Sequence, residues 1–148
     1  MKQGFVKVAS ATPRIRVADP VYNAQVICEQ AKEAAEHGAK IVVFPELCIT
    51  GYTCQDLFLQ ELLLEKAKEA LLTIAEETGQ LETLFLVGLP VDKDGRLYNV
   101  AAVLYRGRIL GMIPKKNIPM YAEFYEGRHF TPGEETVTEY RLGKQVIP

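Results

Sequence analysis

The chain opens with two patterns of apolar residues that indicate a strand and then a helix. Residues 4–11 alternate between apolar and polar positions, a period that predicts a buried strand. Asp19-Pro20 is typical of a helix start, because Asp caps free backbone N–H groups and Pro suits the first turn. His37-Gly38 then ends the helix, since glycine readily takes the left-handed conformation of a C-cap. The expected apolar face of this helix recurs at helical spacing: Val21, Ala24, Ile27, Cys28, Ala31, Ala34 and Ala35.

The middle of the chain repeats the step from strand to helix and then continues with strands alone. The short apolar run 40–44 suits a strand that is covered on both faces. A second helix is expected over residues 56–78, and Gly79 closes it. Its apolar face comprises Leu59, Leu62, Leu63, Ala67, Ala70, Leu71, Ile74 and Ala75. Three further strands are expected at 84–89, 98–105 and 108–113, with turns at 92–95 and 106–107.

This order of elements predicts the fold class α/β. Two strand–helix–strand steps followed by two more strands imply a mixed sheet that carries both helices on one face. A loop-rich segment follows from Pro114, and residues 140–148 look like the start of another strand. We interpret the chain as a truncated domain, and we expect the bare face of its sheet to expose apolar surface.

Composition and charge argue against several classes of partner. The formal net charge is −2, and the densest basic spot, Lys115-Lys116, is too short to form a patch for nucleic acid or a membrane surface. No stretch reaches the roughly 18 apolar residues that span a bilayer. The chain has three cysteines without paired spacing, which indicates a reducing compartment. The N-terminus, which includes Met1–Gln3, shows no signal peptide, so we expect a cytoplasmic protein.

Metal and phosphate sites are not indicated by the sequence. His37 and His129 lie far apart and have no metal-ligand spacing to any cysteine or carboxylate. The glycine-rich phosphate-binding patterns do not occur. We therefore expect no metal and no cofactor within residues 1–148.

Two charged residues follow predicted strands, at the edge where α/β sheets place ligands. Pro45 ends the strand 40–44 and directs Glu46 outward, where apolar neighbours would partly desolvate its carboxylate and make it a better proton acceptor. Lys115 follows the strand 108–113, and a fixed ammonium there stabilises the oxyanion of an attacked carbonyl. Each residue taken alone is better explained as a solvated loop residue.

A third candidate is the segment 121–126, which holds three aromatic residues and two carboxylates. This composition suits a pocket wall with polar anchors. The alternative is a loop that is packed down by its aromatic rings.

Together these segments resemble the nitrilase, or carbon–nitrogen hydrolase, superfamily. Phe-Pro-Glu-Leu at 44–47 with Thr-Gly-Tyr at 50–52 looks like the family's glutamate motif, and residues 114–119 look like its lysine motif. The strands 84–89 and 99–105 resemble its central hairpin. The runs 51–58 and 115–126 are similar to those of glutamine-dependent NAD synthetases, which join a glutaminase domain to a synthetase domain.

The resemblance implies a role for each matching residue. Glu46 would be the general base that activates a cysteine thiol, and Lys115, rather than Lys116, would be the catalytic lysine. Glu123 matches the position of the second, supporting glutamate. The aromatic residues expected to line the glutamine pocket are Tyr52, Tyr121 and Phe124. In the family a cysteine thiolate attacks the amide, ammonia leaves, and water hydrolyses the thioester.

The nucleophilic cysteine is where this chain departs from the family pattern. In the family it lies at a strand end well after the lysine motif, and no such motif occurs here. Cys28 falls on the apolar face of the first helix and Cys54 opens the second, so both are expected to be packing residues. Cys48 is two residues from Glu46, yet residues at that spacing in a loop need not face one pocket. We expect Cys48 not to be the nucleophile.

The resemblance implies that residues 1–148 are the N-terminal part of a glutaminase domain, about one α–β layer of the superfamily's αββα sandwich. The rest of this domain and a C-terminal synthetase domain in the same chain would lie outside it, and ATP and Mg²⁺ would belong to the synthetase domain. The implied function is hydrolysis of glutamine to supply ammonia for NAD synthesis, by a homo-oligomer. Two alternatives remain open: a stand-alone amidase of the nitrilase family, and a non-catalytic α/β interaction domain that has lost its cysteine.

Two expectations follow for the site. The charged groups of Glu46 and Lys115 should lie roughly 3–6 Å apart, although they come from different strands. A carboxylate that close keeps Lys115 protonated. Residues 1–148 alone should be inactive, because neither group supplies a thiolate.

Overall fold

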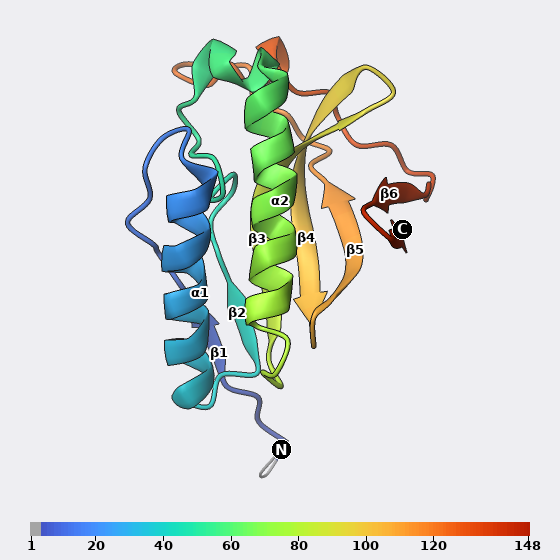
Figure 1. Cartoon of the computed structure of the whole chain (residues 1–148). Helices are drawn as coiled ribbons and strands as arrows, with labels where there is room; N and C mark the ends of the chain where they lie inside the picture. Colours follow the sequence, from blue (N-terminus) through green and yellow to red (C-terminus); the bar gives the residue numbers. More distant parts are fainter. Residues whose placement is uncertain (1–3) are drawn as a thin grey trace.

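The computed structural model describes residues 4–148, which form a five-stranded sheet with two helices packed against it (Figure 1). Met1–Gln3, on which the expected lack of a signal peptide partly rests, lie outside the described residues. The helices are α1 (Pro20–Glu36) and α2 (Glu61–Glu77). The strands of the sheet are β1 (Val8–Ser10), β2 (Ile41–Val43), β3 (Leu84–Lys93), β4 (Arg96–Tyr105) and β5 (Arg108–Pro114).

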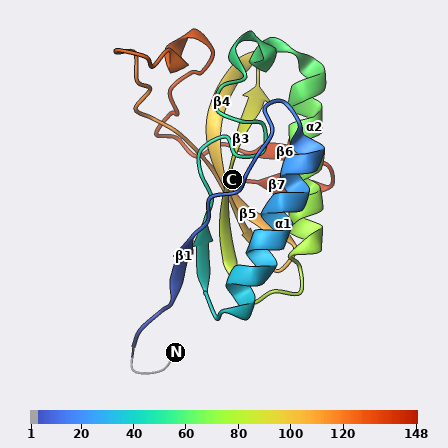
Figure 2. The same cartoon turned by 90° about the vertical axis from the view of Figure 1, so that its left-hand side faces the viewer.

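The strands follow one another across the sheet in chain order, from β1 to β5. β1, β2 and β3 pair in parallel, whereas β3 with β4 and β4 with β5 are antiparallel. Both parallel connections step in the same direction, and such crossovers are right-handed, so both helices reach the same face. Figure 2 shows α1 and α2 on one side of the sheet, which confirms the predicted arrangement. Because β2 and β5 run in one direction, they end at the same edge of the sheet.

The first helix begins where its sequence predicts. The Asp19 side chain accepts a hydrogen bond from the Tyr22 backbone N–H at 3.1 Å, and Pro20 occupies the first turn. Asn23 was not expected on the buried face, yet it is fully buried. Its Oδ1 accepts from the Arg16 N–H at 2.7 Å, and its Nδ2 donates to the carbonyls of Arg16 at 2.7 Å and Ile49 at 2.9 Å. Asn23 therefore ties the segment before α1 to the loop after β2.

The second predicted helix, 56–78, is divided in two by Gln60. A 3-10 helix, η1 (Gln55–Leu59), comes first, and Gln60 takes the extended conformation, with φ −86° and ψ 119°, before α2 starts. The helical phase therefore begins anew at Glu61. Leu59 and Leu62, assigned to the apolar face, are 69% and 64% exposed, so that part of the prediction was wrong. The other six predicted positions pack into the core.

Several strand boundaries also differ from the prediction. β1 is shorter, because its one partner in the sheet, β2, has only three residues to pair with. β2 is covered on one face only, since Val43 is 44% exposed, so the expectation of two covered faces was wrong. β3 and β4 run on past Pro90 to the turn Asp94-Gly95, where both residues have positive φ, 51° and 74°.

The segment after β5 contains two strands where the sequence indicated the start of one. β6 (Tyr140–Leu142) and β7 (Gln145–Ile147) form an antiparallel hairpin outside the main sheet. Leu142 and Ile147 join the main core, and the Met112 N–H donates to the Pro148 carbonyl at 2.9 Å. The hairpin therefore closes against β5. A 3-10 helix, η2 (Glu126–Arg128), lies in the loop between β5 and β6.

The sheet face away from the helices is bare and apolar. Four of its side chains are exposed by between 44% and 64%: Val8, Val43, Leu110 and Ile113. The structure thus confirms the predicted α/β class with both helices on one face and an apolar opposite face.

We predict that Asn23→Ala lowers the free energy of unfolding by about 2–3 kcal/mol, because three hydrogen bonds are lost and backbone groups are left without partners. Urea unfolding of the two proteins measures this difference. Gln25→Ala, at an exposed position of the same helix, is the matched control and should change stability little. Equal stability of Asn23→Ala and the unaltered chain would contradict the assigned role.

Candidate active site

Glu46 projects from a strained turn at the end of β2. The Phe44 N–H still donates to the Leu86 carbonyl at 2.9 Å, so the pairing with β3 continues almost to Glu46. Leu47 then takes a left-handed φ of 51°, which is uncommon for a residue with a Cβ. Complete burial of Leu47 and a hydrogen bond of 2.7 Å from the Gly51 N–H to its carbonyl hold this conformation.

Gly88 of β3 lies directly beneath this turn. A Cβ at position 88 would stand 2.4 Å from the Leu47 nitrogen and 2.6 Å from the Pro45 oxygen, both of them backbone atoms. The Gly88 carbonyl also accepts a hydrogen bond from the Ile49 N–H at 3.1 Å. Glycine at this position therefore lets the turn pack on the sheet and fixes where Glu46 points.

Lys115 reaches the same edge of the sheet from β5. Its backbone N–H donates to the Asn99 carbonyl at 2.8 Å, so the pairing with β4 extends one residue past Pro114. Because β5 runs in the direction of β2, Lys115 and Glu46 meet. The Lys115 Nζ donates to Glu46 Oε2 at 2.9 Å, which confirms the predicted convergence of the two groups.

A second carboxylate, Glu126 of η2, completes the arrangement. The Lys115 Nζ also donates to Glu126 Oε1 at 2.9 Å, and the Tyr52 hydroxyl donates to the same oxygen at 2.7 Å. The Asn99 Nδ2 donates to Glu46 Oε2 at 3.2 Å and to Glu126 Oε2 at 3.5 Å. We call these five residues, Glu46, Tyr52, Asn99, Lys115 and Glu126, the Lys115 cluster.

The two carboxylates of the Lys115 cluster differ in exposure and in the number of donors they receive. The Glu126 side chain is 5% exposed and accepts hydrogen bonds from three side chains of the cluster. The Glu46 side chain is 51% exposed, so it is only partly shielded from solvent and far less buried than Glu126. Both of its hydrogen bonds fall on Oε2, which leaves Oε1 without a hydrogen-bond partner among residues 4–148. Glu46 is therefore the carboxylate that is free to accept a proton.

The two carboxylates keep Lys115 charged. Burial alone would lower the pKa of Lys115, but its hydrogen bonds to Glu46 and Glu126 outweigh burial and hold the pKa above its ordinary value of 10.5. Burial and then the hydrogen bond to Glu126 also raise the pKa of the Tyr52 hydroxyl. At neutral pH the Lys115 cluster therefore presents an ammonium beside a neutral phenol.

The structure distributes the other predicted site residues unevenly. Tyr52 joins the Lys115 cluster, whereas Tyr121 and Phe124 pack edge to face, 5.5 Å between ring centroids, in the loop before η2. Glu123 is exposed and makes no side-chain hydrogen bond to any residue in the described part of the chain. The glutamate that contacts Lys115 from this loop is Glu126, three residues further on.

Two members of the Lys115 cluster were not predicted as site residues, Glu126 and Asn99. Both lie in segments that drew attention, Glu126 in the run 121–126 and Asn99 at the start of a predicted strand. In a loop, spacing does not tell which of two carboxylates faces inward. Asn99 carried a usable signal, because an asparagine inside an apolar strand needs polar partners when it is buried.

The cysteines lie away from the Lys115 cluster and are packing residues, as expected. Cys48 is 2% exposed, its thiol points to the Gly88 carbonyl at 3.6 Å, and burial raises its pKa to about 11. Burial likewise raises the pKa of Cys28 to about 11. The Cys54 thiol donates to the Thr50 carbonyl at 3.1 Å. Thiols with raised pKa values are poor nucleophiles at neutral pH.

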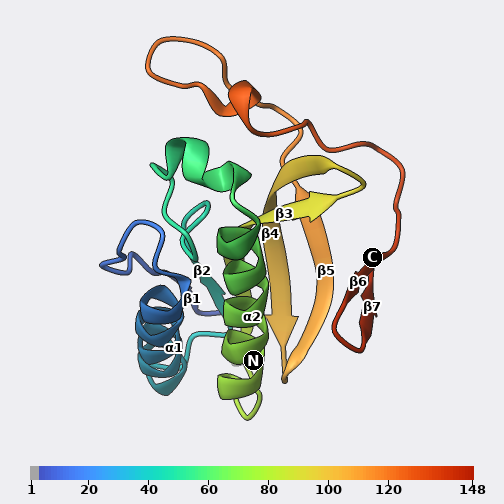
Figure 3. The ribbon, with the colours of Figure 1, turned by 45° about the horizontal axis from the view of Figure 1, so that its top comes forward.

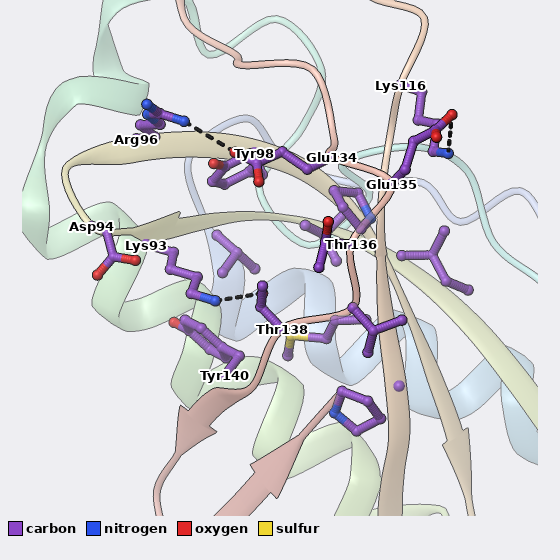
Figure 4. A pocket seen from close by; sticks show the side chains of 18 residues that line it. Lys93, Asp94, Arg96, Tyr98, Lys116, Glu134, Glu135, Thr136, Thr138 and Tyr140 are labelled. Carbon is purple, nitrogen blue, oxygen red and sulfur yellow. Dashed lines mark hydrogen bonds and ion pairs between the residues drawn. The ribbon is translucent and has the colours of Figure 1, made fainter.

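A cavity of about 680 Å³ lies apart from the Lys115 cluster, between the tip of the β3–β4 hairpin, β5 and the segment 134–140 (Figure 4). Tyr98, Met112 and Tyr140 form part of its wall. Its charged rim is balanced, because Arg96 pairs with Glu134 and Lys116 pairs with Glu135.

Within residues 4–148 there is no cluster of three or more metal-ligating side chains, and no helix is long and apolar enough to cross a membrane.

Sequence comparison assigns the chain to a known family. The carbon-nitrogen hydrolase family matches residues 7–146, nearly the whole chain. The chain therefore belongs to the carbon-nitrogen hydrolase family.

Individual relatives narrow the comparison further. The chain is 39% identical, over 96% of its length, to the glutamine-dependent NAD(+) synthetase of Mycobacterium tuberculosis, of which it spans 21%. The crystal structure of such a synthetase from Cytophaga hutchinsonii superposes with a TM-score of 0.90 and 28% identity, over 97% of this chain and 24% of that one. An amidase from Nesterenkonia sp. shares the fold, with a TM-score of 0.71 and 24% identity over 95% of this chain and 53% of its own. The chain spans about a fifth of the length of the curated relatives it matches.

We predict that Glu126→Gln lowers the pKa of Lys115. Burial disfavours the ammonium form, and in this variant one carboxylate instead of two would stabilise that form. A raised lysine pKa stabilises the fold at every pH below the ordinary value of 10.5, and that stabilisation is lost as the pH rises through the higher folded value. Side-chain NMR titration of Lys115 measures the shift. Glu123→Gln is the matched control and should leave the Lys115 titration unchanged. A lower Lys115 pKa in Glu123→Gln but not in Glu126→Gln would show that Glu123 is the glutamate paired with Lys115.

We predict that Gly88→Ala destabilises the protein by about 1–3 kcal/mol, because the added methyl group forces the backbone of the Glu46 turn away from the sheet. Gly111→Ala in β5 is the control, since a Cβ there would meet its nearest neighbour, the Pro148 oxygen, at an ordinary 3.8 Å. Thermal unfolding of both variants provides the measurement. Equal midpoints for the two variants would show that the turn does not rest on Gly88.

Proposed function

We propose that this chain supplies the general base and the cationic group of a glutamine-hydrolysing site in a glutamine-dependent NAD synthetase. The observation that supports it most is the contact of the Lys115 Nζ with both Glu46 and Glu126, each at 2.9 Å. Similarity to named synthetases over nearly the whole chain supports glutamine as the amide substrate. The released ammonia would serve ATP-dependent formation of NAD, and the synthetase part would bind ATP and Mg²⁺.

Glu46 is the general base of the proposed reaction. Its open Oε1 takes the proton of a cysteine thiol while the sulfur attacks the amide carbon of glutamine. The amide oxygen becomes an oxyanion, which the ammonium of Lys115 stabilises. Glu46 returns the proton to the leaving nitrogen, so ammonia departs and a thioester remains. Water then hydrolyses the thioester, which yields glutamate and restores the thiol.

The nucleophile of this reaction comes, in the proposal, from a part of the protein beyond these 148 residues. The three cysteines present are buried and face backbone carbonyls or the core, not the Lys115 cluster. The relatives are several times longer than this chain, which gives room for both the thiol and a C-terminal synthetase domain. Assembly into a homo-oligomer is part of the same proposal.

The substrate would enter along the loop that precedes η2. Tyr121 is 70% exposed and packs edge to face on Phe124, so the pair offers an apolar wall for the methylene groups of glutamine. Glu123 lies in the same loop, and its free carboxylate suits the α-ammonium group of the substrate. Tyr52 would form the part of this wall next to Glu126. A stand-alone amidase is the weaker candidate, because the likeness to the amidase structure extends to the fold alone.

We predict that Glu46→Gln and Lys115→Ala each lower kcat for ammonia release from glutamine by about 100-fold or more in the full-length protein, because general base and oxyanion stabilisation are removed. Coupled detection of ammonia measures the rate. The 148-residue chain alone should show only background release. Turnover by the short chain that is abolished by Cys48→Ala would overturn the placement of the nucleophile.

A further inference from the structure

We propose that Asp56, Arg128 and His129 form a clasp that positions Glu126 against Lys115. The proposal deepens the function proposed above, because Glu126 matters for catalysis only if the Lys115 cluster hydrolyses an amide. Asp56 touches neither Lys115 nor Glu126 and is therefore a positioning residue.

Glu126 needs support from outside its own segment. It lies in a 3-10 helix of only three residues, within a long loop between β5 and β6. Its neighbours in that loop are largely exposed, with Tyr121 at 70% and Tyr125 at 66%. A single turn of helix does not hold its own conformation in water. The burial of Glu126, at 5% exposure, therefore depends on contacts made by the residues around it.

The clasp supplies such contacts between η2 and η1. Arg128 forms a two-pronged ion pair with Asp56 of η1, from Nε to Oδ1 and from a terminal nitrogen to Oδ2, both at 3.0 Å. The His129 Nε2 lies 3.0 Å from the same Oδ1. Figure 3 shows η1 and η2 beside each other at the top of the molecule. The clasp thus joins η2 to η1 two residues after Glu126.

A small apolar cluster beneath the clasp extends the connection to Glu46. Phe130 packs edge to face on Phe58 of η1, 5.0 Å between ring centroids, and His129 packs on the same ring at 5.8 Å. Leu47, next to Glu46, belongs to this cluster, as do Leu63 and Leu97. The segments that carry Glu46 and Glu126 therefore pack on the same apolar cluster. The clasp adds the directional contacts that apolar packing lacks.

The clasp suits local orientation better than global stability. The Asp56 and Arg128 side chains are 61% and 64% exposed, and exposed ion pairs contribute little to the free energy of unfolding. The two-pronged geometry nevertheless fixes the guanidinium plane, and with it the direction of the backbone that leads to Glu126. The hydrogen bonds from His129 and Arg128 lower the pKa of Asp56, so its carboxylate stays ionised at neutral pH.

The test uses Asp56→Asn in the full-length protein, since Asn keeps the shape but turns an amide N–H toward the donors of Arg128. We expect kcat/KM for ammonia release to fall about tenfold, with the unfolding midpoint nearly unchanged. Asp56→Glu, which retains the charge, should recover part of the loss. Glu69→Gln is the control, because Glu69 pairs with Lys66 at similar exposure on the outer surface of α2 and should change neither quantity.

A second readout does not depend on glutamine hydrolysis. The rate at which an amine-directed reagent labels Lys115, followed by mass spectrometry, reports how firmly its ammonium is paired. Lys68 is the internal reference, because its side chain is also 25% exposed and is paired, with Asp92 at 2.6 Å. In Asp56→Asn we expect labelling of Lys115 to rise about threefold or more while labelling of Lys68 stays constant.

The two readouts separate the possible failures. Unchanged labelling of Lys115 in Asp56→Asn would overturn the clasp, whatever the activity. A parallel rise at Lys115 and Lys68 would show general loosening and would overturn it as well. If labelling rises at Lys115 alone but the unaltered full-length protein releases no ammonia from glutamine, the clasp is supported and the proposed function is rejected.

Discussion

An ammonium group with little access to water must have anionic partners, and this requirement organises the functional edge of the molecule. The Lys115 side chain is 25% exposed, and its Nζ is shared between Glu46 and Glu126. An unpaired charge at such a depth would be costly, so the fold must deliver two carboxylates from distant parts of the chain. They arrive from the turn after β2 and from η2, and Asn99 links them through its amide nitrogen.

The sheet and the loops contribute to this site in different ways. Parallel direction of β2 and β5 brings Glu46 and Lys115 to one edge, and Gly88 lets the Glu46 turn lie directly on β3. These positions depend on backbone pairing within the sheet. Glu126 instead depends on side-chain contacts of a loop with η1. The result is one exposed carboxylate with an open oxygen, and one buried carboxylate that accepts three donors and orients the lysine.

The sequence predicts those parts of the molecule that local rules decide. Asp19-Pro20 and His37-Gly38 bounded α1 correctly, and the convergence of Glu46 with Lys115 was expected from their positions after strands together with the family resemblance. It does not predict what distant partners decide. Gln60 breaks the second helix without glycine or proline, and β1 is limited by the length of its neighbour β2. The choice between Glu123 and Glu126 depends on how a loop folds onto η1, which spacing along the chain does not encode.

The central claim, that Glu46 and Glu126 act as a unit through Lys115, is tested most directly by a double-mutant cycle on ammonia release from glutamine. The four proteins are the unaltered full-length protein, Glu46→Gln, Glu126→Gln and the double variant, and the measured quantity is kcat/KM. Residues that act as a unit give strongly non-additive losses. The account predicts that the double variant is hardly worse than Glu46→Gln alone. Losses that multiply in the double variant would show that the two carboxylates act independently and would contradict it.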